Sequence, residues 1–260
     1  MVLLEYTPGT TLFHRLDVRA KLIWLITVVS LSFIFRSLLG VCIVFSWVIL
    51  CILEAKIPTH KLSMHFKILT LPIIIILLYE ALMYHGKSIL LALPFGFTIT
   101  LEGITKGLIF TLRLLIMVLA STIFTYTTPY THILLFLIKV RTPYPIVFML
   151  LISLRFIPGL QRELSMILDA QRARGLELEG AKSIKQLVRV YIPIMIPLLV
   201  NGVKRSRELA MAIVARGFSP KSKWVPLEEI KFKRVDYVFS FTLLALLCVV
   251  VWFRILGFTI

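Results

Sequence analysis

The chain has 260 residues, of which 59% are hydrophobic and 16% are charged, and its mean hydropathy is +0.95. Soluble domains are about half apolar, so this composition excludes a soluble globular domain and indicates an integral membrane protein. The 29 Lys and Arg outnumber the 13 Asp and Glu. No Gly-rich or aromatic RNA-binding pattern accompanies this excess, so we expect no nucleic-acid partner.

Cysteine usage and the opening segment add two expectations. Cys42, Cys51 and Cys248 lie in apolar stretches without a CxxC pair, which argues against a disulfide framework and a zinc site. The segment 1–21 lacks the basic start, apolar stretch and cleavage site of a signal peptide. We therefore expect the mature chain to begin at Met1.

Apolar runs along the chain predict five membrane-spanning helices. The segment 22–53 is one continuous apolar run, interrupted only at Arg36 and Ser37, with Gly40 soon after. Because this run is too long for one span, it predicts a tight hairpin of two helices. Residues 68–84 and 103–126 predict the third and fourth spans, and residues 235–258 predict the fifth.

The region between the fourth and fifth spans has a different character. Its apolar runs, at 145–154 and 190–200, are too short to cross the hydrocarbon and lead into charged amphipathic segments. They predict long, partly embedded helices. We therefore expect an all-α integral membrane protein with three parts: a membrane domain of four transmembrane helices at 1–127, a domain of long amphipathic helices at 128–234, and a last transmembrane helix at 235–260.

Positive charge predicts the orientation. The segment 139–236 holds 18 Lys and Arg, the segments 1–21 and 54–67 hold three each, and the 85–102 loop holds only Lys87. Since Lys and Arg accumulate in cytoplasmic loops, the N-terminus and the 128–234 region are expected in the cytoplasm. The C-terminus is then external, in the plasma membrane of the cell.

Catalytic and cofactor motifs are missing from the sequence. The Gly86-Lys87-Ser88 triplet resembles the end of a phosphate-binding loop, but Ala81 stands where that loop needs glycine. The five histidines are dispersed, and neither HExxH nor GxSxG occurs. We expect no active site, no metal site and no cofactor, and therefore no enzyme.

Two of the charged residues within the predicted spans need explanation. Arg113 lies near the centre of the fourth span, where an unpaired charge is costly, and Glu80 on the third span is a conceivable partner. We favour a structural tie between helices over a contact with substrate. Gly103 and Gly107 form a GxxxG spacing that we interpret as packing only.

The same triplet occurs twice, each time after an amphipathic run: Ala173-Arg174-Gly175 and Ala215-Arg216-Gly217. The first run places Leu160, Leu164, Ile167, Leu168 and Gln171 on one helical face, and the second places Leu199, Val203, Ser206, Ala210 and Ile213 on one face. One interpretation is simple capping, with Gly at the left-handed position and Arg in the last turn. The other is a docking plug, in which Arg enters a groove and forms bidentate bonds with a carboxylate.

These segments resemble the transmembrane T component of energy-coupling factor transporters over almost the whole chain. The resemblance rests on LRFIPGLQRELSMILDAQRARG and RELAMAIVARG, on the opening Leu12–Leu22 segment, and on the Thr127-Thr128-Pro129 turn. Val18 stands where the family commonly has proline. The resemblance implies a scaffold without catalytic activity, whose partners are two ATP-binding cassette ATPase subunits, a substrate-binding S-type membrane subunit and the lipid bilayer.

In that family the cytoplasmic region is a coupling domain, in which two long coupling helices cross and each ends in one ATPase subunit; the resemblance implies the same for residues 128–234. The resemblance therefore implies that Ala173, Arg174 and Gly175, together with Ala215, Arg216 and Gly217, are ATPase-docking residues. The alternative is a secondary transporter or membrane enzyme that binds its own substrate, which would need polar clusters or interrupted helices at the midplane of the membrane. Apart from Arg113 and Glu80, the sequence offers none.

Overall fold

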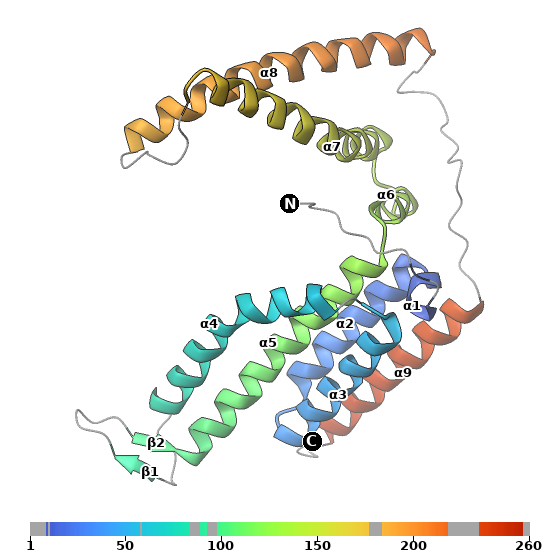
Figure 1. Cartoon of the computed structure of the whole chain (residues 1–260). Helices are drawn as coiled ribbons and strands as arrows, with labels where there is room; N and C mark the ends of the chain where they lie inside the picture. The colour runs from blue at the N-terminus through green and yellow to red at the C-terminus, as the bar shows by residue number, and fades with distance from the viewer. Residues whose placement is uncertain are drawn as a thin grey trace. The chain divides into compact units, whose positions relative to one another are not determined.

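The computed structural model describes residues 9, 11–57, 59–83, 89–92, 98–176, 184–217 and 234–256. The chain divides into two units, one formed by residues 1–136 and 230–260, the other by residues 137–229. The second unit is thus inserted into the first. Figure 1 shows the elements of both units.

The first unit is built from membrane-type helices. Its elements are α1 (Leu12–Arg15), α2 (Val18–Ile34), α3 (Leu38–Ala55), α4 (Thr59–Met83), β1 (Ile89–Ala92), β2 (Thr98–Thr100), α5 (Leu101–Thr127) and α9 (Arg234–Ile255). Helix α6 (Tyr130–Lys139) follows α5 and runs into the second unit. Apart from the antiparallel β1–β2 pair, the described chain is helical, which confirms the predicted fold class.

The core of the first unit follows the helical repeat of the sequence. Buried side chains recur every three or four residues, as expected where one face of each helix is covered. They are Trp24, Val28 and Leu31 on α2, Val41, Val44 and Val48 on α3, and Ile116, Leu119 and Ile123 on α5. Leu243 on α9 belongs to the same cluster. The opposite faces remain apolar and exposed, as on helices that contact lipid.

The predicted hairpin at 22–53 is confirmed, because α2 ends at Ile34 and α3 begins at Leu38. Ser37 caps α3 by accepting a hydrogen bond from the main-chain N–H of Gly40. A Cβ at Gly40 would lie 2.5 Å from a ring carbon of Phe35. The close turn therefore depends on the absence of a side chain at this position.

Helices α4 and α5 pack through the glycines of the GxxxG spacing. A Cβ at Gly103 would lie 2.8 Å from the main-chain oxygen of Glu80, and one at Gly107 would lie 3.3 Å from the Glu80 Cβ. The packing interpretation of this spacing is confirmed. Helix α4 begins at Thr59, well before the span predicted at 68–84, because hydropathy detects only its apolar part. The β1–β2 pair was not predicted.

Five helices among the described residues are long and apolar enough to cross a membrane: Leu38–Ala55, Phe66–Met83, Leu101–Thr127, Tyr144–Ala173 and Arg234–Arg254. The number equals the prediction, but the set differs. Helix α2 has 17 residues, about 25 Å of helix, which is the short end of the range for a spanning helix. The 30-residue helix Tyr144–Ala173 is long and apolar enough to cross a membrane, although the sequence predicts that its apolar start is only partly embedded.

The second unit consists mainly of two long helices, α7 (Tyr144–Ala173) and α8 (Ile184–Ala215). Pro143 precedes α7 and Pro145 lies in its first turn, where proline is tolerated because the first N–H groups have no partner within the helix. Pro158 lies inside α7, and Pro193 and Pro197 lie inside α8. The two helices pack against one another (Figure 1).

Candidate functional site

The first triplet ends α7. The last helical residue is Ala173, and Gly175 adopts a left-handed conformation with φ +85°. The N–H of Gly175 donates to the oxygen of Arg172 at 2.9 Å, and the N–H of Leu176 donates to the oxygen of Gln171 at 3.0 Å. These bonds satisfy carbonyls that the helix end leaves without partners.

The second triplet ends α8 in a similar way. Ala215 is its last helical residue, Gly217 has φ +74°, and its N–H donates to the oxygen of Val214 at 2.9 Å. A Cβ at either Gly175 or Gly217 would meet nothing within 4 Å. Both positions therefore favour glycine for its backbone conformation and not for lack of space.

The side chains of the two arginines take no part in this capping. Arg174 and Arg216 are exposed, and among the described residues neither guanidinium makes a hydrogen bond or an ion pair. The alanines and glycines of both triplets are exposed as well. Capping accounts for the glycine of each triplet but gives the arginine no role.

The predicted faces of the two helices differ in the structure. On α7 the five residues of the first stripe are all partly buried, whereas on α8 four residues of the second face are exposed: Leu199, Val203, Ser206 and Ala210. Only Ile213 of that face is partly buried. The stripe of α7 is thus partly covered, while most of the predicted face of α8 is open.

Helix α7 is tied to α8 near its end. Gln171, three residues before Arg174, donates from Nε2 to the main-chain oxygen of Pro193 at 3.2 Å. Proline at position 197 lacks the N–H that would otherwise bond this carbonyl within the helix. The end of α7 therefore lies beside the first part of α8, as Figure 1 shows.

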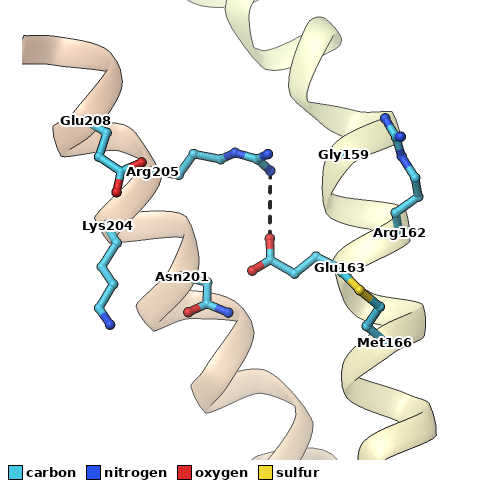
Figure 2. A pocket seen from close by; sticks show the side chains of 8 residues that line it. All are labelled: Gly159, Arg162, Glu163, Met166, Asn201, Lys204, Arg205 and Glu208. Atoms are coloured by element: carbon cyan, nitrogen blue, oxygen red, sulfur yellow. Dashed lines mark ion pairs between the residues drawn. The ribbon is translucent and has the colours of Figure 1, made fainter. Parts of the chain in front are cut away.

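A second tie lies in an open pocket of about 510 Å³ between the two helices (Figure 2). Arg205 of α8 points toward α7, and its NH1 lies 3.9 Å from Oε2 of Glu163. The guanidinium also lies over the ring of Phe156, 5.6 Å from its centroid. A Cβ at Gly159 would lie 3.2 Å from NH1. Phe156, Gly159 and Glu163 recur at helical spacing, so one face of α7 receives this arginine.

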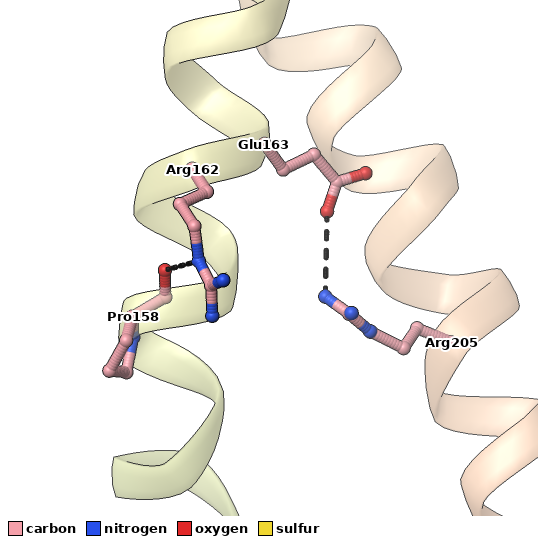
Figure 3. Close-up of polar contacts among 4 residues, drawn as sticks. All are labelled: Pro158, Arg162, Glu163 and Arg205. Atoms are coloured by element: carbon pink, nitrogen blue, oxygen red, sulfur yellow. Dashed lines mark hydrogen bonds and ion pairs between the residues drawn. The ribbon is translucent and has the colours of Figure 1, made fainter.

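Arg162, next to Glu163 on α7, does not contact α8 in the way that Arg205 contacts α7. Its Nε donates to the main-chain oxygen of Pro158 at 3.3 Å, one turn back on the same helix (Figure 3). Arg205 and Glu163 join α7 to α8, whereas the hydrogen bond of Arg162 stays within α7. The ion pair is partly exposed and contributes on the order of 0.5 kcal/mol, with a similar amount from the aromatic ring.

The two triplets are far apart along this helix pair. Pro193 lies beside the end of α7, and from there to Arg216 the chain extends by about 35 Å of helix at roughly 1.5 Å per residue. Figure 1 shows the end of α7 near the start of α8, and the end of α8 at the opposite extremity. The unit thus presents two separate, chemically matching ends.

Comparison with known proteins places this arrangement in a family. The family model described as "Cobalt transport protein" (CbiQ) matches residues 9–226, a range that includes both triplets. The chain belongs to this family. It is also similar to the "Energy-coupling factor transporter transmembrane protein EcfT" of several bacteria.

Three of these EcfT relatives illustrate the extent of the similarity. The Bacillus subtilis protein is 32% identical over 226 residues, which cover 84% of each chain. The Exiguobacterium sibiricum protein is 31% identical over 98% of this chain and 99% of its own. The Listeria innocua protein is 29% identical over 98% of both chains. The chain is therefore a T-type transmembrane component of the energy-coupling factor transporter family and a multi-pass membrane protein.

Arg113 of this EcfT-type chain ties α5 to α2. Its Nε donates to the main-chain oxygen of Ser32 and its NH2 to that of Phe35, both at 2.9 Å. These carbonyls lie at the C-terminal end of α2, where helical partners are lacking and positive charge is favourable. Glu80 and Arg113 line one apolar pocket, but the ion pairs of the described residues do not join them. The tie in the structure is a main-chain cap.

Two sequence predictions, on a phosphate-binding loop and on metal ligands, and one omission remain. Residues 86–88, which resemble the end of a phosphate-binding loop, lie outside the described residues. Within the described part of the chain, no three His, Cys, Asp or Glu gather as metal ligands. The contact between Arg205 and Glu163 was not predicted from the sequence. Their opposite charges on neighbouring amphipathic helices were a usable signal. The small Gly159, which lies between Phe156 and Glu163 in the sequence, was another.

Proposed function

We propose that the chain is the non-catalytic scaffold of an ATP-driven importer, in which α7 and α8 pass motion from two ATP-binding cassette subunits to a substrate-binding membrane subunit. Arg174 and Arg216 are the docking residues, one for each ATP-binding subunit. The observation that carries this proposal is the pair of exposed arginines without side-chain partners among the described residues. They stand at matching positions next to glycine caps.

The chemistry of arginine explains what such a site binds. A guanidinium offers five donors in a planar fork and pairs with a carboxylate through two parallel bonds. The small alanine and glycine on either side allow the helix end to enter a groove. Because the two ends are about 35 Å apart along the helix pair, they suit two separate sockets better than one.

Contacts between α7 and α8 support a coupling role for the pair. The Gln171 bond and the Arg205 contacts join the helices at two levels, so displacement of one helix end is transmitted to the other helix. The exposed apolar residues in the first halves of these helices, among them Met149 and Leu150 on α7 and Ile192 and Met195 on α8, form the surface for the substrate-binding subunit.

A transporter that binds its own substrate would need polar groups at the membrane midplane that are available to a ligand. The Arg113 guanidinium instead donates its two hydrogen bonds to carbonyls at the end of α2. Arg113 thereby serves the structure of the membrane unit. This use of the charge favours the scaffold over the stand-alone transporter.

Affinity purification of the tagged chain from its native membrane, followed by mass spectrometry, tests the proposal. The wild-type chain is expected to retain ATP-binding subunits, and the Arg174→Ala/Arg216→Ala variant to lose them while reaching the membrane at normal levels. Arg172→Ala is the matched control, because Arg172 is already engaged with Asp169 at 3.8 Å on the same helix. Retention of the subunits by the double variant, or their loss in the control, contradicts docking through the triplets.

A further inference from the structure

A buried charged cluster lies at one end of the first unit. Asp17, Lys21 and Asp236 are only 6%, 2% and 2% exposed. Lys21 donates from Nζ to the main-chain oxygen of Thr127 at 2.8 Å, and the main-chain N–H of Asp17 donates to Oδ1 of Asp236 at 3.0 Å. The cluster joins the start of α2 to the last residue of α5 and the first turn of α9, which lie at the same end of this unit (Figure 1).

Apolar packing already holds this end of the unit together. The ring of Phe13 in α1 lies edge to face with Trp24 of α2 at 5.3 Å and with Phe239 of α9 at 6.4 Å. Burying charged side chains costs free energy because burial removes their hydration, and well-packed apolar side chains in their place are often as stable or more stable. Moreover, Asp17 Oδ2 and Thr128 Oγ1 are buried without a hydrogen-bond partner among the described residues. Stability alone therefore does not explain the cluster.

The position of the cluster in the chain indicates another role. The second unit, residues 137–229, is inserted into the first, so the chain leaves after α5 and α6 and returns at α9. Lys21 holds the end of α5, from which the chain continues through α6 into the second unit. Asp236 lies in the first turn of α9, where the chain returns. Both connections are thus bonded to one short segment at the start of α2.

We propose that Lys21 is a positioning residue: with Asp17 and Asp236 it fixes both connections of the inserted unit to α2, so that movement of α7 and α8 reaches α5 and α9 together. This role rests on the proposed function, in which α7 and α8 move with the ATP-binding subunits. Hydrogen bonds are directional and hold a helix end against sliding and rotation, whereas apolar contacts are not directional.

Hydrogen exchange in the complete transporter tests this role. The complex with its ATP-binding subunits is placed in lipid nanodiscs and measured without nucleotide and after trapping with ATP and vanadate. In the wild type, trapping is expected to change exchange at the end of α5 and the start of α9 in the same direction. Lys21→Met keeps the side-chain length and removes the donor. It is expected to retain the ATP-binding subunits and to raise nucleotide-free exchange at the end of α5 about tenfold, while the joint response of the two segments to trapping is lost.

Arg15→Met is the matched control, since Arg15 is exposed in the same opening segment, and it is expected to respond like the wild type. If Lys21→Met does not accumulate in the membrane, the double variant Lys21→Met/Asp236→Asn is measured in its place, and the same result is expected. The double variant removes the positive charge and one of the two negative charges. The remaining negative charge, on Asp17, lies at the N-terminus of α2, where it caps the helix. If the variant that is measured shows the same joint change in exchange on trapping as the wild type, Lys21 does not have this role. The same conclusion follows if Arg15→Met loses the joint change to the same extent as the Lys21 variant. A wild-type complex that retains no ATP-binding subunits removes the proposed function, and with it this role.

Discussion

Gly175 and Gly217 both adopt positive φ at the ends of α7 and α8, while the arginine beside each glycine is exposed. The repeated triplet allowed two interpretations, capping and docking. In the structure capping accounts for the glycine, and docking stays a prediction for the exposed arginine. Glycine ends the helix, and arginine is available to a partner.

This separation predicts opposite effects for two adjacent substitutions. Gly175→Ala imposes a left-handed conformation on a residue with a Cβ, so the helix end should lose about 1–2 kcal/mol of stability. Arg174→Ala should leave stability within about 0.5 kcal/mol of the wild type, as is usual for exposed positions. Thermal unfolding of the purified variants measures both. A loss of stability in Arg174→Ala equal to that in Gly175→Ala would show that arginine belongs to the cap.

The burial of individual charged side chains could not be predicted from the sequence. Lys21 precedes the first apolar run and was counted only as one of the positive charges near the N-terminus. Its burial depends on contacts with Thr127 and with the segment around Asp236, both distant in the chain. Likewise, the sequence predicted a structural tie through Arg113, with Glu80 as a conceivable partner, but the partners in the structure are main-chain carbonyls of Ser32 and Phe35. Local patterns do not specify such partners, because tertiary packing brings them together.

At the scale of the elements, hydropathy predicted the membrane helices well. The fourth predicted span, 103–126, corresponds to α5 (Leu101–Thr127), and the fifth, 235–258, to α9 (Arg234–Ile255). Long apolar runs with clear interruptions carry this information. Short helices such as α1 and α6 were not predicted, because they hold too few turns for a periodic pattern.

The contact between α7 and α8 allows a charge-reversal prediction. Glu163→Arg places a second guanidinium opposite Arg205 and should weaken the helix pair by about 0.5–1 kcal/mol. Arg205→Glu in the same chain should restore it. Cysteines at Met166 and Asn201, which line the same pocket, report the change through the yield of crosslinking by a bifunctional maleimide.

Arg162→Glu is the control for this reversal, since the hydrogen bond of Arg162 stays within α7. It should leave the crosslinking yield close to that of the wild type. No recovery in the double reversal would show that the pair does not join the helices.

At the scale of the whole molecule, the charge distribution determines the expected orientation. Lys and Arg concentrate in residues 139–236 and are nearly missing from 85–102. The positive-inside rule therefore predicts α7 and α8 on the cytoplasmic side with the ATP-binding subunits. The apolar length of α7 does not decide its depth, because a long helix with a charged second half suits partial embedding as well as crossing.

Labelling of single cysteines tests this orientation. In a variant without the three native cysteines, a cysteine at Leu101, exposed at the start of α5, should react with an impermeant maleimide added outside intact cells. A cysteine at Arg172, near the end of α7, should react only after the membrane is opened. The reverse pattern would contradict the orientation.

The number of ATP-binding subunits bound to one chain tests the central claim most directly, because each triplet is proposed to hold one subunit. Native mass spectrometry of the purified complex measures this number. We expect two subunits on the wild-type chain, one on Arg174→Ala, one on Arg216→Ala and none on the double variant, with two retained by Arg172→Ala. Two subunits on the double variant, or the loss of both from Arg172→Ala, would contradict the claim that the two arginines are separate docking points.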